Sequence, residues 1–285
     1  MPATRSQKNK RKNRKSKSKP GSKLTAKTAD RHKLYEEAVQ CPEAEVEFLD
    51  RVYRQKHGSD PASLREDFCG TGLSSCTWTR LRPENVAYGV DLDPAVLEWG
   101  REHNLSWLNE NERERVHLIE GDVLATDTPP VDILVAMNFS YYTFKTRREL
   151  IEYFKVARSN VKDNGLFVCD CYGGYEAQDV LEEERECSDF TYVWDQDEFN
   201  PITNETVCHI HFHFKDGTRL KKAFSYDWRL WSIAEIREAL EEAGFSSSTV
   251  YWEGTDDDGE GNGEFEPTEE GEVCAGWIAY IVADP

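Results

Sequence analysis

A glycine-rich turn between an extended run and a helix is the feature that most limits what this chain can fold into. Residues 64–78 read LREDFCGTGLSSCTW, with the turn at Cys69-Gly70-Thr71-Gly72. Glycines at such a turn let backbone N–H groups come close to a ligand, because a side chain would block the approach. Plain tight connections also use glycine-rich turns, so this pattern alone does not separate ligand binding from ordinary structure.

The next strand ends in an acidic residue. Residues 87–98 read AYGVDLDPAVLE, an apolar run that reaches Asp91 and continues into a helix opened by proline. In doubly wound folds, an acidic side chain at the end of the second strand accepts hydrogen bonds from a ribose. Asp91 follows the glycines by about 20 residues, the offset expected for nucleoside recognition. The turn and the acid together favour ligand binding over a plain connection.

Two further strands end in polar residues, and helices alternate with the strands. Residues 116–126 end a strand in Gly121-Asp122, and residues 131–142 form a buried type of strand that leads into a polar and aromatic turn. Such alternation calls for a parallel sheet covered by helices, with the ligand at the carboxyl ends of the strands. The expected elements are strands at 64–68, 86–90, 116–119, 132–137 and 165–171, and helices at 72–80, 94–103 and 147–160.

These motifs resemble those of the class I S-adenosylmethionine-dependent methyltransferases. The resemblance covers about residues 64–285 and implies an enzyme with S-adenosyl-L-methionine as its cofactor. The family usually has a glycine where this chain has Phe68, and its usual acid two places earlier would be Glu66, with Asp67 standing beside it. The cofactor-binding residues that the resemblance implies are Glu66, Phe68, Cys69, Gly70, Thr71, Gly72, Asp91, Leu92, Gly121, Asp122, Val123, Met137 and Asn138.

Other nucleotide-binding classes fit less well. A dinucleotide-binding turn needs a third glycine so that the helix can close on the strand beside a pyrophosphate, and Cys76 stands in that place. The turn is not followed by the Gly-Lys-Ser/Thr of a phosphate-binding loop.

An antiparallel insertion is expected after the fifth strand. Residues 190–231 alternate around turns at Asn200-Pro201 and Asp216-Gly217, and residues 232–243 then form a capped helix. The predicted fold is therefore α/β and Rossmann-like, with a seven-stranded, mostly parallel sheet and a β insertion before the last helix. This layout resembles small-molecule methyltransferases, including the glycine-type N-methyltransferases. The resemblance implies that Tyr172, Tyr226, Arg229 and Trp231 bind the substrate.

The turn after the fourth strand holds the candidate catalytic residues, Asn138, Tyr141 and Tyr142. A sulfonium is already a strong electrophile, so methyl transfer depends on aligning and desolvating the nucleophile. A nearby carbonyl or phenol can orient that nucleophile. His209, His211 and His213 alternate on one expected strand and share a face, but nothing fixes further ligands, so no metal is expected.

Charge divides the chain into a basic tail and an acidic body. The net charge is −19, although the first 33 residues are dense in Lys and Arg and contain Asp30 as their one acid. An acidic body repels phosphate backbones and suits a cationic substrate. The predicted segments are a disordered tail (1–28), N-terminal helices (29–62) and a methyltransferase domain (63–285), the last with the β insertion (190–231) and an acidic loop (253–272).

The sequence leaves three functions open. The first is methyl transfer to a small-molecule acceptor, favouring an amine nitrogen. The second is methylation of a protein or RNA, with the basic tail contacting RNA or the ribosome, and the third is a non-catalytic binding protein on the same fold. No apolar run is long enough for a membrane span or a signal peptide, so the expected location is the cytoplasm.

Overall fold

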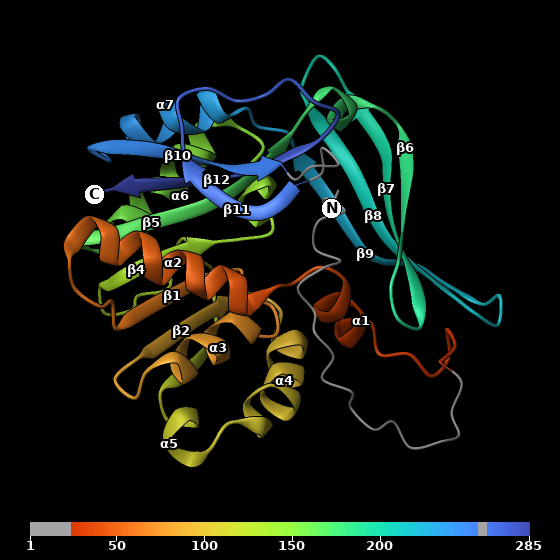
Figure 1. Cartoon of the computed structure of the whole chain (residues 1–285), viewed down its shortest axis with the longest axis horizontal. Helices are drawn as coiled ribbons and strands as arrows, with labels where there is room; N and C mark the ends of the chain where they lie inside the picture. The colour runs from red at the N-terminus through yellow and green to blue at the C-terminus, as the bar shows by residue number, and fades with distance from the viewer. Residues whose placement is uncertain (1–23, 256–260) are drawn as a thin grey trace.

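The larger of two β-sheets has eight strands, five of them parallel. The computed structural model describes residues 24–255 and 261–285. The parallel strands β1 to β5 form one side of the sheet, and the last three strands of the chain extend it in antiparallel fashion (Figure 1). In sheet order the strands are β11 (Gly261–Pro267), β10 (Ser247–Thr255), β12 (Trp277–Asp284), β5 (Val161–Gly173), β4 (Val131–Ala136), β1 (Ser63–Asp67), β2 (Val86–Asp91) and β3 (Val116–Glu120).

The α/β architecture agrees with the sequence prediction, but the predicted strand number of seven is wrong. The extra strand is β11, which pairs with β10 inside the segment 253–272 that was expected to be a loop. Its sequence, GNGEFEP, lacks the apolar alternation of a buried strand. An edge strand needs only one hydrogen-bonded neighbour and tolerates charged residues, which explains why the pattern was missed. Residues 256–260 of that segment lie outside the described residues.

Helices cover both faces of the large sheet. Alternate residues of β4 separate two cores: Ile133 and Val135 pack with α2 and α3, whereas Leu134 and Ala136 pack with α6 and α7. The helices are α1 (Arg31–Ala38), α2 (Pro42–His57), α3 (Leu73–Leu81), α4 (Pro94–His103), α5 (Glu110–Arg113), α6 (Arg147–Ser159) and α7 (Ile233–Ala243), with short 3-10 turns η2 (Leu105–Trp107), η3 (Ser140–Thr143) and η4 (Tyr175–Gln178). Among the described residues, no helix has the length and apolar character needed to cross a membrane.

A second, four-stranded antiparallel sheet stands at the carboxyl ends of the parallel strands, next to α1 (Figure 1). We call it the roof sheet. Its strands are β6 (Leu181–Glu186), β7 (Phe190–Asn200), β8 (Glu205–Phe214) and β9 (Arg219–Arg229). The sheet therefore starts before the predicted insertion at 190–231, because the polar edge strand β6 (LEEERE) carries no apolar alternation.

The N-terminal part of the described chain is held against the roof sheet. The backbone N–H of Ala26 donates to Thr218 Oγ1 at the β8–β9 turn, and Leu24 and Ala26 pack on the main core. Asp30 caps α1 and accepts a hydrogen bond from Trp99 Nε1 at 2.7 Å. Residues 1–23 of the predicted tail lie outside the described residues.

An ion pair sits in the middle of the large sheet. Arg65 and Asp67 lie on β1 with 0% and 1% of their side chains exposed, and Arg65 Nε is 2.7 Å from Asp67 Oδ1. Arg65 also donates to the backbone oxygens of Thr126 and Val123 and to Asn160 Oδ1. The pair thus joins β1 to the β3–β4 connection and to the end of α6.

We predict that replacing one partner of this pair is costly. Arg65→Leu leaves the Asp67 carboxylate buried without a cation, and should lower the free energy of unfolding by about 3–5 kcal/mol. Denaturant unfolding measures this loss. Lys155→Gln breaks an exposed pair with Glu152, whose side chains are 50% and 59% exposed, and should cost less than about 1 kcal/mol. Similar losses in the two variants would contradict this assignment.

Candidate functional site

Four carboxylates gather at the carboxyl ends of the parallel strands. Asp91 ends β2, Glu66 and Asp170 lie near the carboxyl ends of β1 and β5, and Glu45 of α2 is close enough for its charge to act on both. Burial raises the pKa of Glu66, and the neighbouring charges of Glu45 and Asp91 raise it further. Among the described residues, the partners of these four carboxylates are backbone N–H groups and serine hydroxyls rather than cations.

The glycine-rich turn and the acid of β2 are directly connected. Gly70 N donates to Asp91 Oδ2 at 2.8 Å, and Asp93 N donates to Asp91 Oδ1 at 2.9 Å. Gly70 has a φ of 54°, and a Cβ built on it meets no atom within 4 Å. Open space therefore lies beside this backbone, as close approach of a ligand requires. Gly72 differs, because a Cβ there would lie 2.6 Å from Leu118 Cδ2.

Glu66 and Asp67 have different surroundings, which separates their roles. Asp67 is neutralised by Arg65 and accepts a hydrogen bond from Tyr153 at 3.1 Å. Glu66 Oε2 accepts from Ser75 N at 3.0 Å and from Ser75 Oγ at 2.6 Å, at the start of α3. Burial is the main reason that the pKa of Glu66 rises to about 8. Of the two, Glu66 is the carboxylate that lacks a cation.

Phe68, the departure from the usual glycine, keeps the backbone conformation that glycine favours. Its φ is 58°, in the left-handed region that costs most side chains energy. The ring lies near Phe144 and Tyr153, with centroid distances of 6.2 and 5.7 Å. Aromatic packing offsets the strain, so the turn is preserved with a side chain in place of hydrogen.

Two helices cover the turn through residues that the sequence analysis missed. Thr71 Oγ1 and Asn104 Nδ2 both donate to Glu36 Oε1 of α1 at 2.7 Å, and Ser74 Oγ donates to Glu45 Oε2 of α2 at 2.9 Å. Cys69 is buried, and its N–H donates to Val90 O. Sequence patterns predict that glutamates on amphipathic helices are exposed to solvent. Only the tertiary contacts show that Glu36 and Glu45 face the turn.

The predicted adenine-side residues follow β2 and β3. Leu92 is 67% exposed beside Asp91, whereas Val123 is 4% exposed. Gly121 N donates to Asp91 O at 3.0 Å, and Asp122 Oδ1 accepts from Leu124 N at 2.9 Å. The loops after β2 and β3 are thus joined by a backbone hydrogen bond, and both Leu92 and Asp122 are exposed on them.

The turn after β4 is fixed by Asp170. Asn138 and Phe139 have φ angles of 60° and 57°, and their N–H groups donate to the two oxygens of Asp170 at 2.7 and 2.8 Å. Met137, which precedes them, is 7% exposed. Burial raises the pKa of Asp170 to about 7 despite these two hydrogen bonds. A buried carboxylate thus holds a strained turn at the sheet edge.

The predicted catalytic tyrosines are inside the core. Tyr141 and Tyr142 are both 0% exposed. The Tyr141 hydroxyl donates to Asp170 O at 2.8 Å and that of Tyr142 to Trp231 O at 3.4 Å. These contacts favour a packing role for the two phenols, whereas Asn138 remains at the strand end.

The four predicted substrate residues differ in their contacts and in their exposure. Arg229 lies 3.8 Å from the ring centre of Trp231 and donates to Glu235 Oε1, which fastens β9 to α7. Trp231 is 1% exposed and donates to Phe144 O. Tyr172 is also 1% exposed, whereas Tyr226 on the roof sheet and Arg229 are half-buried.

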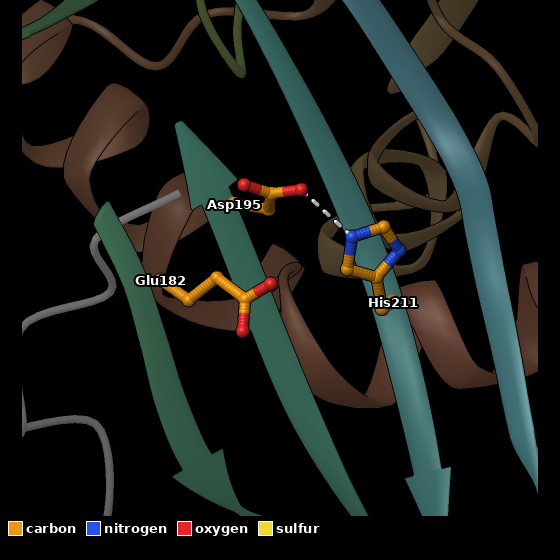
Figure 2. A group of neighbouring side chains, drawn as sticks. All are labelled: Glu182, Asp195 and His211. Atoms are coloured by element: carbon orange, nitrogen blue, oxygen red, sulfur yellow. Dashed lines mark hydrogen bonds and ion pairs between the residues drawn. The ribbon is translucent and has the colours of Figure 1, made fainter. Parts of the chain in front are cut away.

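The three histidines lie on the outer face of the roof sheet, paired with acids. His211 Nε2 is 2.9 Å from Asp195 Oδ2, and Glu182 lies beside them (Figure 2). However, Lys222 N donates to His211 Nδ1 at 2.6 Å, which places the ring proton on Nε2. A metal-bound imidazole instead donates from its second nitrogen. Both ring nitrogens of His211 thus have hydrogen-bond partners within the protein.

His209 and His213 continue the same row. His209 lies between Ser225 and Asp197, at 2.8 and 3.1 Å, and His213 Nδ1 is 3.6 Å from Glu184. The prediction that no metal is involved stays a prediction, which the arrangement of hydrogen bonds favours.

Comparison with solved structures identifies the fold. A methyltransferase dependent on S-adenosylmethionine from Clostridium acetobutylicum aligns over 88% of this chain and 96% of its own, with a TM-score of 0.64 and 14% identity. A sugar N-methyltransferase from Streptoalloteichus aligns over 94% and 96%, with a TM-score of 0.60 and 18% identity. An amino pentose methyltransferase from Micromonospora echinaspora, with the cofactor bound, aligns over 94% and 100%, with a TM-score of 0.63 and 14% identity.

No protein-family model matches the sequence, and a search of curated proteins gave no match. At identities of 14–18%, the structural likeness establishes a shared fold: the Rossmann-like α/β fold of these methyltransferases, with a mainly parallel central sheet. The chain spans nearly the full length of each of the three structures.

We predict that Glu66 makes the free protein less stable as pH rises. Its folded pKa of about 8 lies above the unfolded value, so the folded state keeps a proton that the unfolded state loses. The contribution of Glu66 to the free energy of unfolding is therefore fully present below its unfolded pKa of about 4.5 and is lost as the pH rises through about 8. Glu66→Gln should remove this loss, because glutamine has no proton to lose. Its effect on the free energy of unfolding should therefore be more favourable at pH 8 than at pH 5, by about 1 kcal/mol or more.

Denaturant unfolding of both proteins at several pH values tests the prediction. Glu47→Gln, at an exposed position of α2, is the matched control and should show a flat difference. A Glu66→Gln difference that is equally flat would contradict the assignment of Glu66 as a buried carboxylate without a cation.

Proposed function

We propose that this chain is an S-adenosylmethionine-dependent methyltransferase that transfers the methyl group to an amine nitrogen of a small molecule. The observation that carries the proposal is the junction of Gly70 and Asp91. A backbone N–H bound to the acid of β2, beside open space, is the arrangement that nucleoside binding needs. The shared fold of the solved methyltransferases supports it.

The residues at the site fit this cofactor. Asp91 has the position to bind the ribose hydroxyls, and Leu92, Asp122 and Val123 to bind the adenine. Glu66, which lacks a cation, would bind the amino group of the methionine part. The cofactor brings a positively charged sulfonium and an ammonium group, and these charges balance carboxylates that are otherwise buried alone. When bound, it supplies an electrophilic methyl group for direct displacement.

Buried charge also supports an amine acceptor. Asp170 and Glu45 lie near the strand ends without a cationic partner, so a positively charged substrate lowers their desolvation cost. With a pKa of about 7, Asp170 can take a proton from the acceptor's ammonium and free its lone pair. The sugar N-methyltransferase and the glycopeptide N-methyltransferase among the structures of this fold are consistent with that choice.

Two other functions remain as outcomes of the tests. The basic tail could deliver a protein or RNA substrate to the same site, and a chain that binds no cofactor would be a binding protein on this fold. The expected cytoplasmic location stays a prediction.

We predict that S-adenosylmethionine and S-adenosylhomocysteine bind the full chain and that Asp91→Ala binds them at least about tenfold more weakly. Loss of the ribose contacts and of the Gly70 hydrogen bond removes two interactions of about 1 kcal/mol each. Titration calorimetry measures both affinities, and Asp93→Ala, next in the same loop, is the matched control. Absence of binding by the wild-type chain would refute the enzyme proposal.

We predict that deletion of residues 1–23 leaves the kcat/KM for a free amine acceptor unchanged within about twofold. The deletion keeps Leu24 and Ala26, which pack on the core. A screen of small amines with the cofactor, read by release of S-adenosylhomocysteine, supplies the acceptor. A large loss of activity on deletion would favour a macromolecular substrate recruited through the tail.

A further inference from the structure

The face of the roof sheet that turns toward the large sheet is aromatic. Phe224, Tyr226 and Trp228 alternate along β9 on this face, and Trp194 of β7 lies beside them. The rings of Tyr226 and Trp228 are stacked with centroids 4.3 Å apart, and Trp194 is 6.1 Å from Tyr226. The outer face, by contrast, carries the paired histidines and acids. The aromatic side chains of the roof sheet are therefore on the face that packs toward the large sheet.

Helix α1 packs against this aromatic face. Tyr35 packs on Phe224 with a centroid distance of 4.9 Å, and its hydroxyl interacts with that of Tyr226. Tyr35 and Tyr226 are only half-buried, whereas Trp194 and Trp228 are buried. Tyr35, Phe224 and Tyr226 thus form the partly exposed edge of the aromatic surface, and the ring of Trp228 lies directly behind that of Tyr226.

The aromatic surface continues to the strained turn of the site. Trp228 lies 6.4 Å from Phe139 and 6.0 Å from Tyr142, both of which follow β4. Phe139 N is bound to Asp170, whose charge also acts on Tyr35, as does that of Glu45. Burial raises the pKa of Tyr35 and of Tyr226, so the phenols are neutral beside the two carboxylates. The carboxylates of Asp170 and Glu45 and the electron-rich rings of this surface are therefore neighbours.

We propose that Tyr35, Tyr226 and Trp228 form the acceptor site and that they bind the acceptor's nitrogen as a cation, either a protonated or an N-methylated ammonium. Aromatic faces attract such cations through their quadrupoles, most strongly where water is excluded. This inference rests on the proposed function and adds the chemical class of the acceptor. The site retains a methylated product as well as a substrate, because each carries the same positive charge.

The experiment compares choline with 3,3-dimethylbutan-1-ol, its neutral carbon analogue of the same shape. Titration calorimetry is done on the free protein and on the protein saturated with S-adenosylhomocysteine. Choline carries no nitrogen lone pair, so it binds without reacting. We expect choline to bind roughly tenfold more tightly than the neutral analogue. Equal affinities, or no binding of choline in either form, would overturn the inference.

Four variants separate rings from charge. Tyr226→Phe keeps the ring and should keep the preference for choline, whereas Tyr226→Leu and Tyr35→Leu should each reduce it several-fold. Tyr175→Leu, a tyrosine that is 65% exposed on η4, is the matched control and should leave the preference unchanged. If both leucine variants at Tyr35 and Tyr226 keep the full preference, the carboxylates alone attract the cation and the aromatic site is refuted.

Failure of the aromatic acceptor site and failure of the proposed methyltransferase function give different results. Binding of S-adenosylhomocysteine without a preference for choline removes only the cationic acceptor site. A preference for choline without cofactor binding leaves an ammonium-binding site in a protein that is not a methyltransferase.

Discussion

The buried ion pair of Arg65 and Asp67 is the interaction on which the arrangement of the site depends. A charge in the middle of a sheet is tolerated only when every polar atom around it is satisfied. Arg65 meets this demand by donating to Asp67, to the backbone after β3 and to Asn160 after α6. The same contacts fix the β3–β4 connection, which carries Asp122 and Val123, relative to the glycine-rich turn that follows β1. Asp122, Val123 and the glycine-rich turn are therefore positioned by one guanidinium.

Backbone strain is concentrated at the same sheet edge. Phe68, Asn138 and Phe139 adopt left-handed conformations immediately after β1 and β4. Each costs free energy that the surroundings must offset, by aromatic packing around Phe68 and by the two hydrogen bonds that Asp170 accepts from the N–H groups of the second turn. Turns that reverse direction sharply bring backbone N–H groups and strand ends to one place. The strained residues and the carboxylates therefore meet because the chain must turn where the strands end.

Charge gives this edge its chemical character. Glu66, Asp91 and Asp170 are held by N–H and hydroxyl donors rather than by cations, and burial raises the pKa of each. Phenols and indoles of the roof sheet pack beside the same region. A site of this kind attracts cations, and both the cofactor and the acceptor proposed here carry positive charge. Structure and proposed chemistry are thus linked by the need to balance buried carboxylates.

The sequence alone determined the α/β class and the order in which the parallel strands and their helices follow along the chain. It also determined where the glycine-rich turn and Asp91 lie, because all of these follow from local periodicity and short spacings. It did not determine strands β6 and β11, since polar edge strands carry no apolar alternation. It could not choose between Glu66 and Asp67, because adjacent strand residues face opposite sides and only packing shows which side holds Arg65. The docking of helices brings Glu36 and Glu45 to the glycine-rich turn and packs Tyr35 on the roof sheet. It also gives Tyr141, Arg229 and Trp231 hydrogen bonds to distant parts of the chain. Such contacts join residues far apart in the chain, and only the tertiary structure decides them.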